Sequence, residues 1–265
     1  MKMCSIASGS SGNCTYVGTE ETSILVDAGI SCKRIEQGLR ALDREARKLD
    51  GILITHEHSD HISGLGVLAR RYHIPVFLTG GTHDAIMRSS TGRNIDPDVF
   101  HEIREDESFR IGDMEILPFT IPHDAAQPVG YRMTDGRHSA AVATDMGKYN
   151  DYIVDHLMGL NAILLEANHD VNMVEVGPYP YPLKQRILGD RGHLSNENAG
   201  RLLCRILHDD LEAVFLGHLS KENNYEKLAY ETVCSEIRMD KAPYTPECFH
   251  IEVARRDGLS NLVTL

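Results

Sequence analysis

Residues 55–61 read Thr55-His56-Glu57-His58-Ser59-Asp60-His61 and follow directly on the apolar run Ile52-Leu53-Ile54. They contain the pattern H-x-H-x-D-H. Alternate residues of an extended segment point to the same side, so His56 and His58 can bind one cation while Asp60 and His61 face a second. Ligand-type residues at such short offsets after a buried strand have little structural use. The segment therefore predicts a metal site at the end of a strand.

The other apolar runs are also followed by polar residues. These runs cover residues 24–26, 140–143, 162–165 and 213–216, and their length without alternation is typical of strands buried on both faces. The polar residues that follow them are Asp27, Asp145, Glu166 and His218. A rigid scaffold can bring such strand ends together at one site. Two cations a few ångströms apart would need a bridging carboxylate, further imidazoles and an open position for water.

Helical periodicity lies between the apolar runs. Apolar residues recur at helical spacing over residues 65–72, 199–207 and 225–233, and we expect Ser63, Ser195 and Ser220 to cap these helices. The segment from Val99 to Thr134 instead predicts short strands and turns. Sheets covered by helices are typical of an α/β or α+β protein.

Composition limits the function classes. The 265 residues are 42% hydrophobic and carry no repeat or linker, which predicts one domain over residues 1–265. The net charge of −12 argues against an extended basic surface for nucleic acid or membrane. The six cysteines form no C-x-x-C pair, and no apolar run is long enough to span a membrane. We therefore expect a cytoplasmic protein; its oligomeric state is not predicted.

The H-x-H-x-D-H pattern resembles that of the metallo-β-lactamase fold superfamily, and the resemblance covers nearly the whole chain. It implies an α+β fold, a four-layer αββα sandwich, with two divalent metal ions, zinc or manganese, at one edge. His123, in Thr120-Ile121-Pro122-His123-Asp124, then Asp145 and His218 occur in the family's order. The resemblance assigns His56, His58 and His123 to one metal and Asp60, His61 and His218 to the other. It makes Asp145 the bridge and Asp27 the residue that orients a ligand histidine.

Simpler interpretations remain for some of these residues. His123 alone would more often be a loop histidine, and Asp145 is also suited to cap a helix. The histidines outside the motifs are expected at the surface or paired with a partner: His73, His83, His101, His138, His156, His208 and His250.

Glu166, then Gly192-His193-Leu194-Ser195, then His218-Leu219-Ser220 form a series that resembles the tRNase Z and nucleic-acid-processing branch. In that branch the middle histidine serves with the glutamate as a proton donor. Phosphodiester cleavage must protonate a leaving alkoxide, and a histidine polarised by a carboxylate can do so near neutral pH. Otherwise His193 is a turn residue and Glu166 a salt-bridge partner.

Several residues are candidates for phosphate contact. Lys184, Arg186 and Arg191 precede His193, and arginine forks onto phosphate oxygens. Ser195 and Ser220 belong to the two H-x-S motifs, and Lys221 follows the second. A solvated loop is nearly as good an interpretation of the basic group. Residues 8–13, Ser-Gly-Ser-Ser-Gly-Asn, could approach an anion through their backbone, although a tight hairpin is favoured.

The opening residues 4–13 and the two H-L-S motifs look most like the YycJ/WalJ-like group of metallo-hydrolases. That likeness implies an exonuclease-like phosphodiesterase acting on DNA. We expect a metal-bridging hydroxide to attack phosphorus, with Asp60 orienting it and His193, supported by Glu166, protonating the leaving oxygen. A thioesterase or lactonase at the same centre, or a non-catalytic metal-binding module, are the alternatives. Histidine and aspartate ligands do not decide between zinc and manganese.

Overall fold

Two β-sheets pack face to face in the computed structural model, which describes residues 1–92 and 95–265. Within these ranges each sheet has seven strands. The first sheet has the order β14 (Val263–Thr264), β1 (Lys2–Ala7), β2 (Cys14–Gly18), β3 (Ser23–Val26), β4 (Gly51–Leu53), β5 (Val76–Thr79), β6 (Phe100–Ile103). The second has the order β13 (His250–Val253), β12 (Ala213–Gly217), β11 (Ala162–Glu166), β10 (Ser139–Ala143), β9 (Val129–Thr134), β8 (Met114–Thr120), β7 (Phe109–Ile111).

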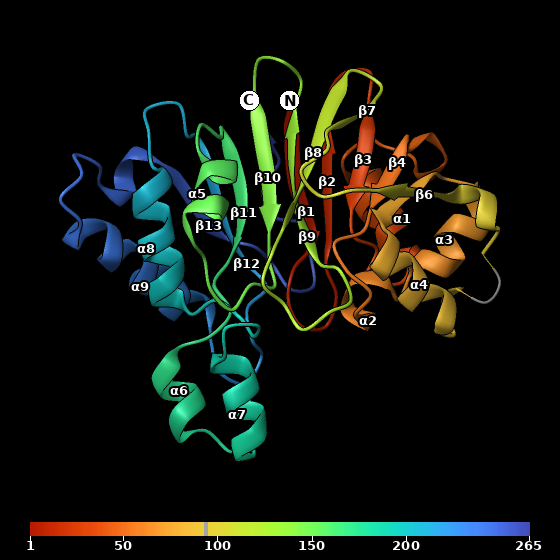
Figure 1. Cartoon of the computed structure of the whole chain (residues 1–265). Coiled ribbons are helices and arrows are strands. Elements are labelled where there is room, and N and C mark those ends of the chain that lie inside the picture. The colour runs from red at the N-terminus through yellow and green to blue at the C-terminus, as the bar shows by residue number, and fades with distance from the viewer. Residues whose placement is uncertain (93–94) are drawn as a thin grey trace.

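Helices cover the outer faces of both sheets (Figure 1). On the first sheet lie α1 (Cys32–Ala41), α3 (Leu65–Tyr72) and α4 (Gly80–Arg88). On the second lie α5 (Asp151–Leu157), α8 (Asn196–Ile206) and α9 (Glu226–Met239). The short helix α2 (Ser59–Ile62) lies at the lower edge of the sandwich in Figure 1. Helices α6 (Val171–Val176) and α7 (Tyr181–Leu188) project downward from the same edge. The described ranges also contain the short 3₁₀ turns η1 (Ala46–Lys48), η3 (Pro97–Val99) and η4 (Pro246–Cys248).

Three apolar layers hold the four structural layers together. Side chains such as Val17, Leu53 and Phe215 fill the space between the two sheets. A second cluster packs α1, α3 and α4 on the first sheet, and a third packs α5, α8 and α9 on the second. Because each sheet is buried on both faces, its central strands are apolar throughout, which is the reason for their unalternating sequence. The predicted αββα sandwich is confirmed.

Strand direction places the carboxyl ends of several strands at one edge. β3, β4 and β5 pair in parallel in the first sheet, and β10, β11, β12 and β13 do so in the second. All five apolar runs form strands, and the segment from Val99 to Thr134 forms β6 to β9 as predicted. The polar residues that follow the runs therefore meet at this edge.

Two of the three predicted helix caps are wrong. Ser195 caps α8 by accepting a hydrogen bond from the Asn198 N–H at 3.2 Å. Ser63 instead ends α2 and donates to the Gly29 carbonyl, and α3 begins after Gly64. Ser220 lies in a turn, five residues before Tyr225, the residue that precedes α9. Both helices begin within one residue of the predicted start, but the two serines lie in the turns before them: Ser63 donates to a carbonyl, and Ser220 accepts the Asn223 N–H within its own turn.

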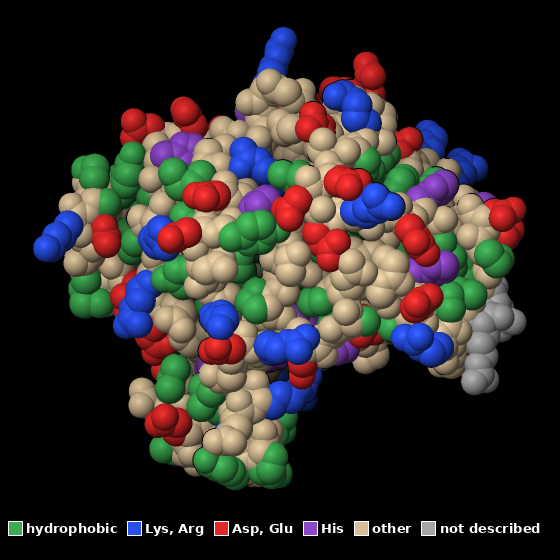
Figure 2. Space-filling view, viewed as in Figure 1, with side chains coloured by type: hydrophobic (Ala, Val, Ile, Leu, Met, Phe, Trp, Pro, Cys, Tyr) green, Lys and Arg blue, Asp and Glu red, His purple; other side chains and the backbone are tan. Residues whose placement is uncertain are grey.

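The arm formed by α6 and α7 exposes apolar side chains. Val176 is 84% exposed and Tyr181 70%, and Figure 2 shows apolar atoms gathered at the tip of this projection. Elsewhere, no helix of the described ranges combines the length and the apolar character that crossing a membrane requires. All six cysteines are free thiols.

Candidate metal centre

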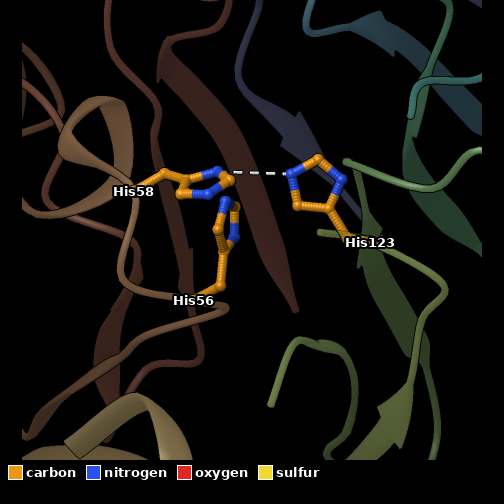
Figure 3. A group of neighbouring side chains, drawn as sticks. All are labelled: His56, His58 and His123. Carbon is orange, nitrogen blue, oxygen red and sulfur yellow. Dashed lines mark hydrogen bonds between the residues drawn. The ribbon is translucent and has the colours of Figure 1, made fainter. Parts of the chain in front are cut away.

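Three histidine rings converge at the edge where the strands end (Figure 3). His56 and His58 lie on the segment between β4 and α2, and His123 follows β8. Their ring centroids are 4.6 to 5.0 Å apart, and His123 Nε2 lies 3.3 Å from His58 Nδ1. One nitrogen from each ring lies within 4.8 Å of the others, a spacing that a single cation can bridge.

A second group adjoins the first and combines a carboxylate with two imidazoles. His218 Nε2 is 3.3 Å from Asp60 Oδ2, and His61 Nε2 is 3.6 Å from the same oxygen. Asp60 and His61 belong to the first turns of α2, whereas His218 follows β12 in the other sheet. The centre therefore joins the two halves of the sandwich.

Asp145 lies between the two groups. Its Oδ2 is 3.2 Å from His61 Nε2, and its Oδ1 is 3.5 Å from His218 Nε2 and 3.8 Å from His123 Nε2. It caps no helix, since α5 begins after Asn150, whose side chain accepts from the Ile153 N–H. Only 2% of Asp145 is exposed, so its charge faces the histidines and not solvent.

The second nitrogen of each buried ring is held by an acceptor. Asp27 Oδ2 accepts from His61 Nδ1 at 2.7 Å, as the predicted orienting residue would. The other acceptors are Glu166 Oε1 for His218 Nδ1 (3.0 Å), the Gly192 carbonyl for His123 Nδ1 (3.1 Å) and Thr55 Oγ1 for His56 Nδ1 (3.0 Å). These contacts fix the orientation of each ring so that its Nε2 faces the other members of the centre.

Burial and charge act in opposite directions on these rings. Burial lowers the pKa of His56 well below its usual value, and repulsion from His61 adds to that effect. Burial also works against the charged form of His61, but Asp27 and Asp145 outweigh it and raise its pKa well above the usual value. Asp145 and neighbouring carboxylates raise the pKa of His218 in the same way. Negative charge thus dominates the centre and attracts any cation.

The donor set fits a metal site by two observations. First, His56 Nε2 and Asp145 Oδ2 are buried and have no hydrogen-bond partner among the described residues. Second, the carboxylates of Asp27, Asp60, Asp145 and Glu166 have ion pairs only with histidines, and none with lysine or arginine, over the described ranges. Buried carboxylates without a fixed cation are costly, and imidazole with carboxylate suits a borderline divalent ion.

The backbone is strained at three of these residues. Asp27, Asp145 and His218 have φ values of 64°, 61° and 55°. This left-handed region is uncommon for residues other than glycine, and such outliers cluster at functional sites. Each residue follows its strand directly or by one position, so the turn aims its side chain at the edge. Gly29 adds to this geometry, because a Cβ there would lie 1.7 Å from the Asp60 carbonyl oxygen.

Glu166 and His193 adjoin the second group. His193 Nδ1 lies 2.8 Å from Glu166 Oε1 and 3.6 Å from Asp145 Oδ1. The same Glu166 oxygen contacts His218, while Oε2 accepts from the Met146 and Leu194 N–H groups. Its pKa falls to about 2, because the attraction of His193 and hydrogen bonds from both histidines outweigh burial. His193 keeps 16% of its side chain exposed, so one face of the ring reaches solvent.

The predicted phosphate contacts have internal partners. Arg186 forks onto the Asp124 carboxylate at the rim of the centre, and Arg191 Nε donates to the His123 carbonyl at 3.0 Å. Lys184 Nζ donates to the Glu175 carbonyl on α6 at 2.7 Å, so it braces the arm. Ser195 and Ser220 each accept a backbone N–H and are nearly buried.

Sequence reasoning missed three residues that contact members of the histidine and carboxylate cluster. Asn13 Nδ2 is 3.1 Å from His61 Nε2 and 3.3 Å from the Asp60 carbonyl, so residues 8–13 form a turn that reaches the centre. Ser8 Oγ accepts from the His218 N–H at 2.8 Å, and Asn168 Nδ2 donates to the His218 carbonyl at 2.7 Å. His169, also outside every motif, is buried beside Asn168. The feature of the sequence that came nearest to indicating these contacts was the predicted turn at residues 8–13, which contains Ser8 and Asn13.

Comparison with known proteins agrees with this geometry. Residues 22–216 match the family model described as the Beta-lactamase superfamily domain. The chain belongs to the β-lactamase superfamily. Within this superfamily it is 39% identical over 246 residues to "Exodeoxyribonuclease YycJ" of Bacillus anthracis, covering 93% of this chain and 92% of that one. It is 41% identical over 232 residues to "Exodeoxyribonuclease WalJ" of Streptococcus pneumoniae serotype 2, covering 88% and 86%.

A solved structure also shares the fold. The metallo-β-lactamase fold protein YhfI from Bacillus subtilis superposes with a TM-score of 0.70 at 16% identity, over 98% of this chain and 99% of that one. The four-layer arrangement is therefore that of the superfamily.

Proposed function

We propose that this chain is a metal-dependent exodeoxyribonuclease. The observation that carries the proposal is the pairing of a histidine and carboxylate centre with His193, whose Nδ1 lies 2.8 Å from Glu166. The names of two relatives at 39% and 41% identity support DNA as the substrate. We also infer a cytoplasmic location, which the six free cysteines support, and one domain over residues 1–265.

We assign two divalent ions to the centre, zinc or manganese. His56, His58 and His123 would hold one, Asp60, His61 and His218 the other, and Asp145 would contact both. Bound metal ions supply Lewis acidity at phosphate oxygens and lower the pKa of water. Asp27 would keep His61 in the required tautomer through its 2.7 Å hydrogen bond.

The remaining chemistry belongs to residues of the chain. Asp60, 22% exposed at its side chain, would accept a hydrogen bond from the attacking water and orient it. His193 would donate a proton to the leaving oxygen, because its ring is partly exposed and polarised by a buried carboxylate. Glu166 acts as a positioning residue, since its oxygens contact His193, His218 and two backbone N–H groups and leave none for substrate.

The test is a substrate panel with purified protein supplemented with zinc or manganese. We expect hydrolysis of linear DNA and none of thioesters or lactones, and loss of DNA hydrolysis in Asp60→Ala. Asp190→Ala changes an exposed aspartate that pairs with Lys148 and is the matched control. Hydrolysis of a thioester with intact DNA would overturn the assignment in favour of an acyl hydrolase. Metal binding without any turnover would leave only a metal-binding module.

A further inference from the structure

A basic cavity adjoins the metal centre and has no role in the chemistry above. Its volume is about 460 Å³, and its walls come from the loop after β1, the segment between β12 and α9 together with the first turn of α9, and the residues after β13. Ser8, in its lining, accepts from the His218 N–H at 2.8 Å, and Leu219 and Ser220 continue the wall. The cavity and the centre therefore share the backbone around His218.

The charge of the cavity differs from that of the chain. Lys221, Lys227 and Arg256 line it, with Glu226 as the one acidic residue among the lining. None of the three cations forms an ion pair with any described residue, and Arg255 beside them is equally free. In a protein of net charge −12, several cations that lie together at one cavity without a carboxylate partner favour an external anion.

Arg256 is fixed in place without an anionic partner. Its Nη2 donates to the Leu219 carbonyl at 2.7 Å, and its Nη1 is buried without a hydrogen-bond partner in the described structure. A Cβ at Gly9 would lie 2.8 Å from Nη1, so the guanidinium packs tightly on that glycine. A half-buried cation held by one carbonyl is costly, and an anion in the adjoining cavity would offset that cost.

We propose that this cavity binds a phosphate group of the DNA strand whose scissile bond lies at the metal centre. The inference rests on the proposed function and deepens it, because it assigns a second phosphate position to the same site. Lys221 and Lys227 are exposed at the rim and supply mobile charge, while Arg256 supplies a fixed charge at the wall. Ser220 and Asn224 also line the cavity, but their polar atoms bond to neighbouring residues of the chain, so the charge available to an anion comes from the three cations.

The test is a charge-reversal pair, Lys221→Glu with Lys227→Glu. Its matched control is Arg137→Glu with Lys241→Glu, which changes the net charge equally. Arg137 precedes β10 at the end opposite Asp145, and Lys241 follows α9, whose 14 residues span about 21 Å. All four residues are exposed, so folding should survive in both variants.

We expect the cavity pair to raise the Kd for a fluorescent oligonucleotide about 10-fold more than the control pair. It should also make the slope of log affinity against log salt less negative by about 0.7 to 0.9, the contribution of one phosphate. Hydrolysis of bis(p-nitrophenyl) phosphate, which has one phosphate, should be unchanged. In a series of strands, each with one phosphate replaced by a neutral methylphosphonate, the cavity pair and the control pair should bind equally well when the replaced phosphate is the one that the cavity holds. Strands with a 5′-phosphate, a 3′-phosphate or neither distinguish a terminal from an internal phosphate.

Equal losses in the cavity and control pairs, with wild-type protein degrading DNA, would overturn the cavity assignment alone. A methylphosphonate scan without any position that cancels the difference would do the same. Failure of the wild type to bind or degrade DNA would overturn the proposed function, and this inference with it.

Discussion

At the scale of single residues, Asp145 is the contact common to all parts of the centre. It lies within 3.8 Å of His61, His123 and His218, which belong to both proposed metal positions. We therefore expect Asp145→Ala to lower the occupancy of both metals together. Elemental analysis of gently purified protein should find close to two ions per chain in the wild type and a lower metal content in the variant. Retention of either ion at full occupancy would contradict a bridging position.

His193 is the residue at which metal binding and proton transfer can be separated. Its ring contacts Glu166 but belongs to neither of the two proposed ligand sets. We expect His193→Ala to keep the metal content while lowering kcat on DNA about 10²- to 10⁴-fold, the usual contribution of a general acid. The loss should be much smaller on bis(p-nitrophenyl) phosphate, because nitrophenolate leaves without a proton.

The control for that variant is His250→Ala, which removes an exposed histidine paired with Glu252. It should leave both activities unchanged. Equal losses on DNA and on the activated ester in His193→Ala would exclude the proton-donor role and leave His193 a structural residue.

At the scale of elements, Ser195 tests whether a motif residue serves the helix or the substrate. Its hydroxyl accepts the Asn198 N–H at 3.2 Å and only 4% of the residue is exposed. We expect Ser195→Ala to lower the free energy of unfolding by about 1 kcal/mol, as loss of an N-cap does, in a urea titration. Asn150→Ala removes the cap of α5 and should cost about as much. A fall in DNA affinity in Ser195→Ala that Asn150→Ala does not share would indicate that Ser195 contacts phosphate after all.

The elements also explain which parts of the site were open to prediction. Except for His123, which only the order of the family's motifs indicated, each predicted ligand follows one of the apolar runs, and a strand end is visible in the sequence because the run and its polar successor are adjacent. The supporting contacts join residues far apart, such as Ser8 and His218, which are 210 residues apart. Nothing in the local sequence of Ser8, Asn13 or Asn168 records such a partner. The cap at Ser63 failed for a related reason, since its hydroxyl donates to the distant Gly29 carbonyl, and the cap at Ser220 failed because a serine can accept a backbone N–H in a turn as well as at a cap.

At the scale of the whole molecule, a strongly acidic protein must bind a polyanion. Figure 2 shows lysine and arginine interspersed with aspartate and glutamate over the visible face, with no basic stripe. Binding therefore depends on the metal ions and a few cations, chiefly Lys221, Lys227 and Arg256 at the cavity. Few phosphates are neutralised, so we expect a slope of log affinity against log salt of only about −2 to −4. A slope steeper than about −6, measured by fluorescence anisotropy, would indicate an extended groove instead.

A short footprint of this kind favours action at a strand end. Internal cutting requires the protein to hold a continuous duplex on both sides of the scissile bond, and the acidic surface repels those flanking phosphates. A free end presents few phosphates, and α2, which carries Asp60 and His61, lies at the same edge of the sandwich from which α6 and α7 project (Figure 1). We therefore expect rapid loss of linear DNA, single or double stranded, while covalently closed circles of the same sequence persist in zinc or manganese. Gel electrophoresis over a time course measures both substrates in one reaction. Nicking of closed circles at a comparable rate, abolished in Asp60→Ala, would overturn end dependence and leave phosphodiester hydrolysis in place.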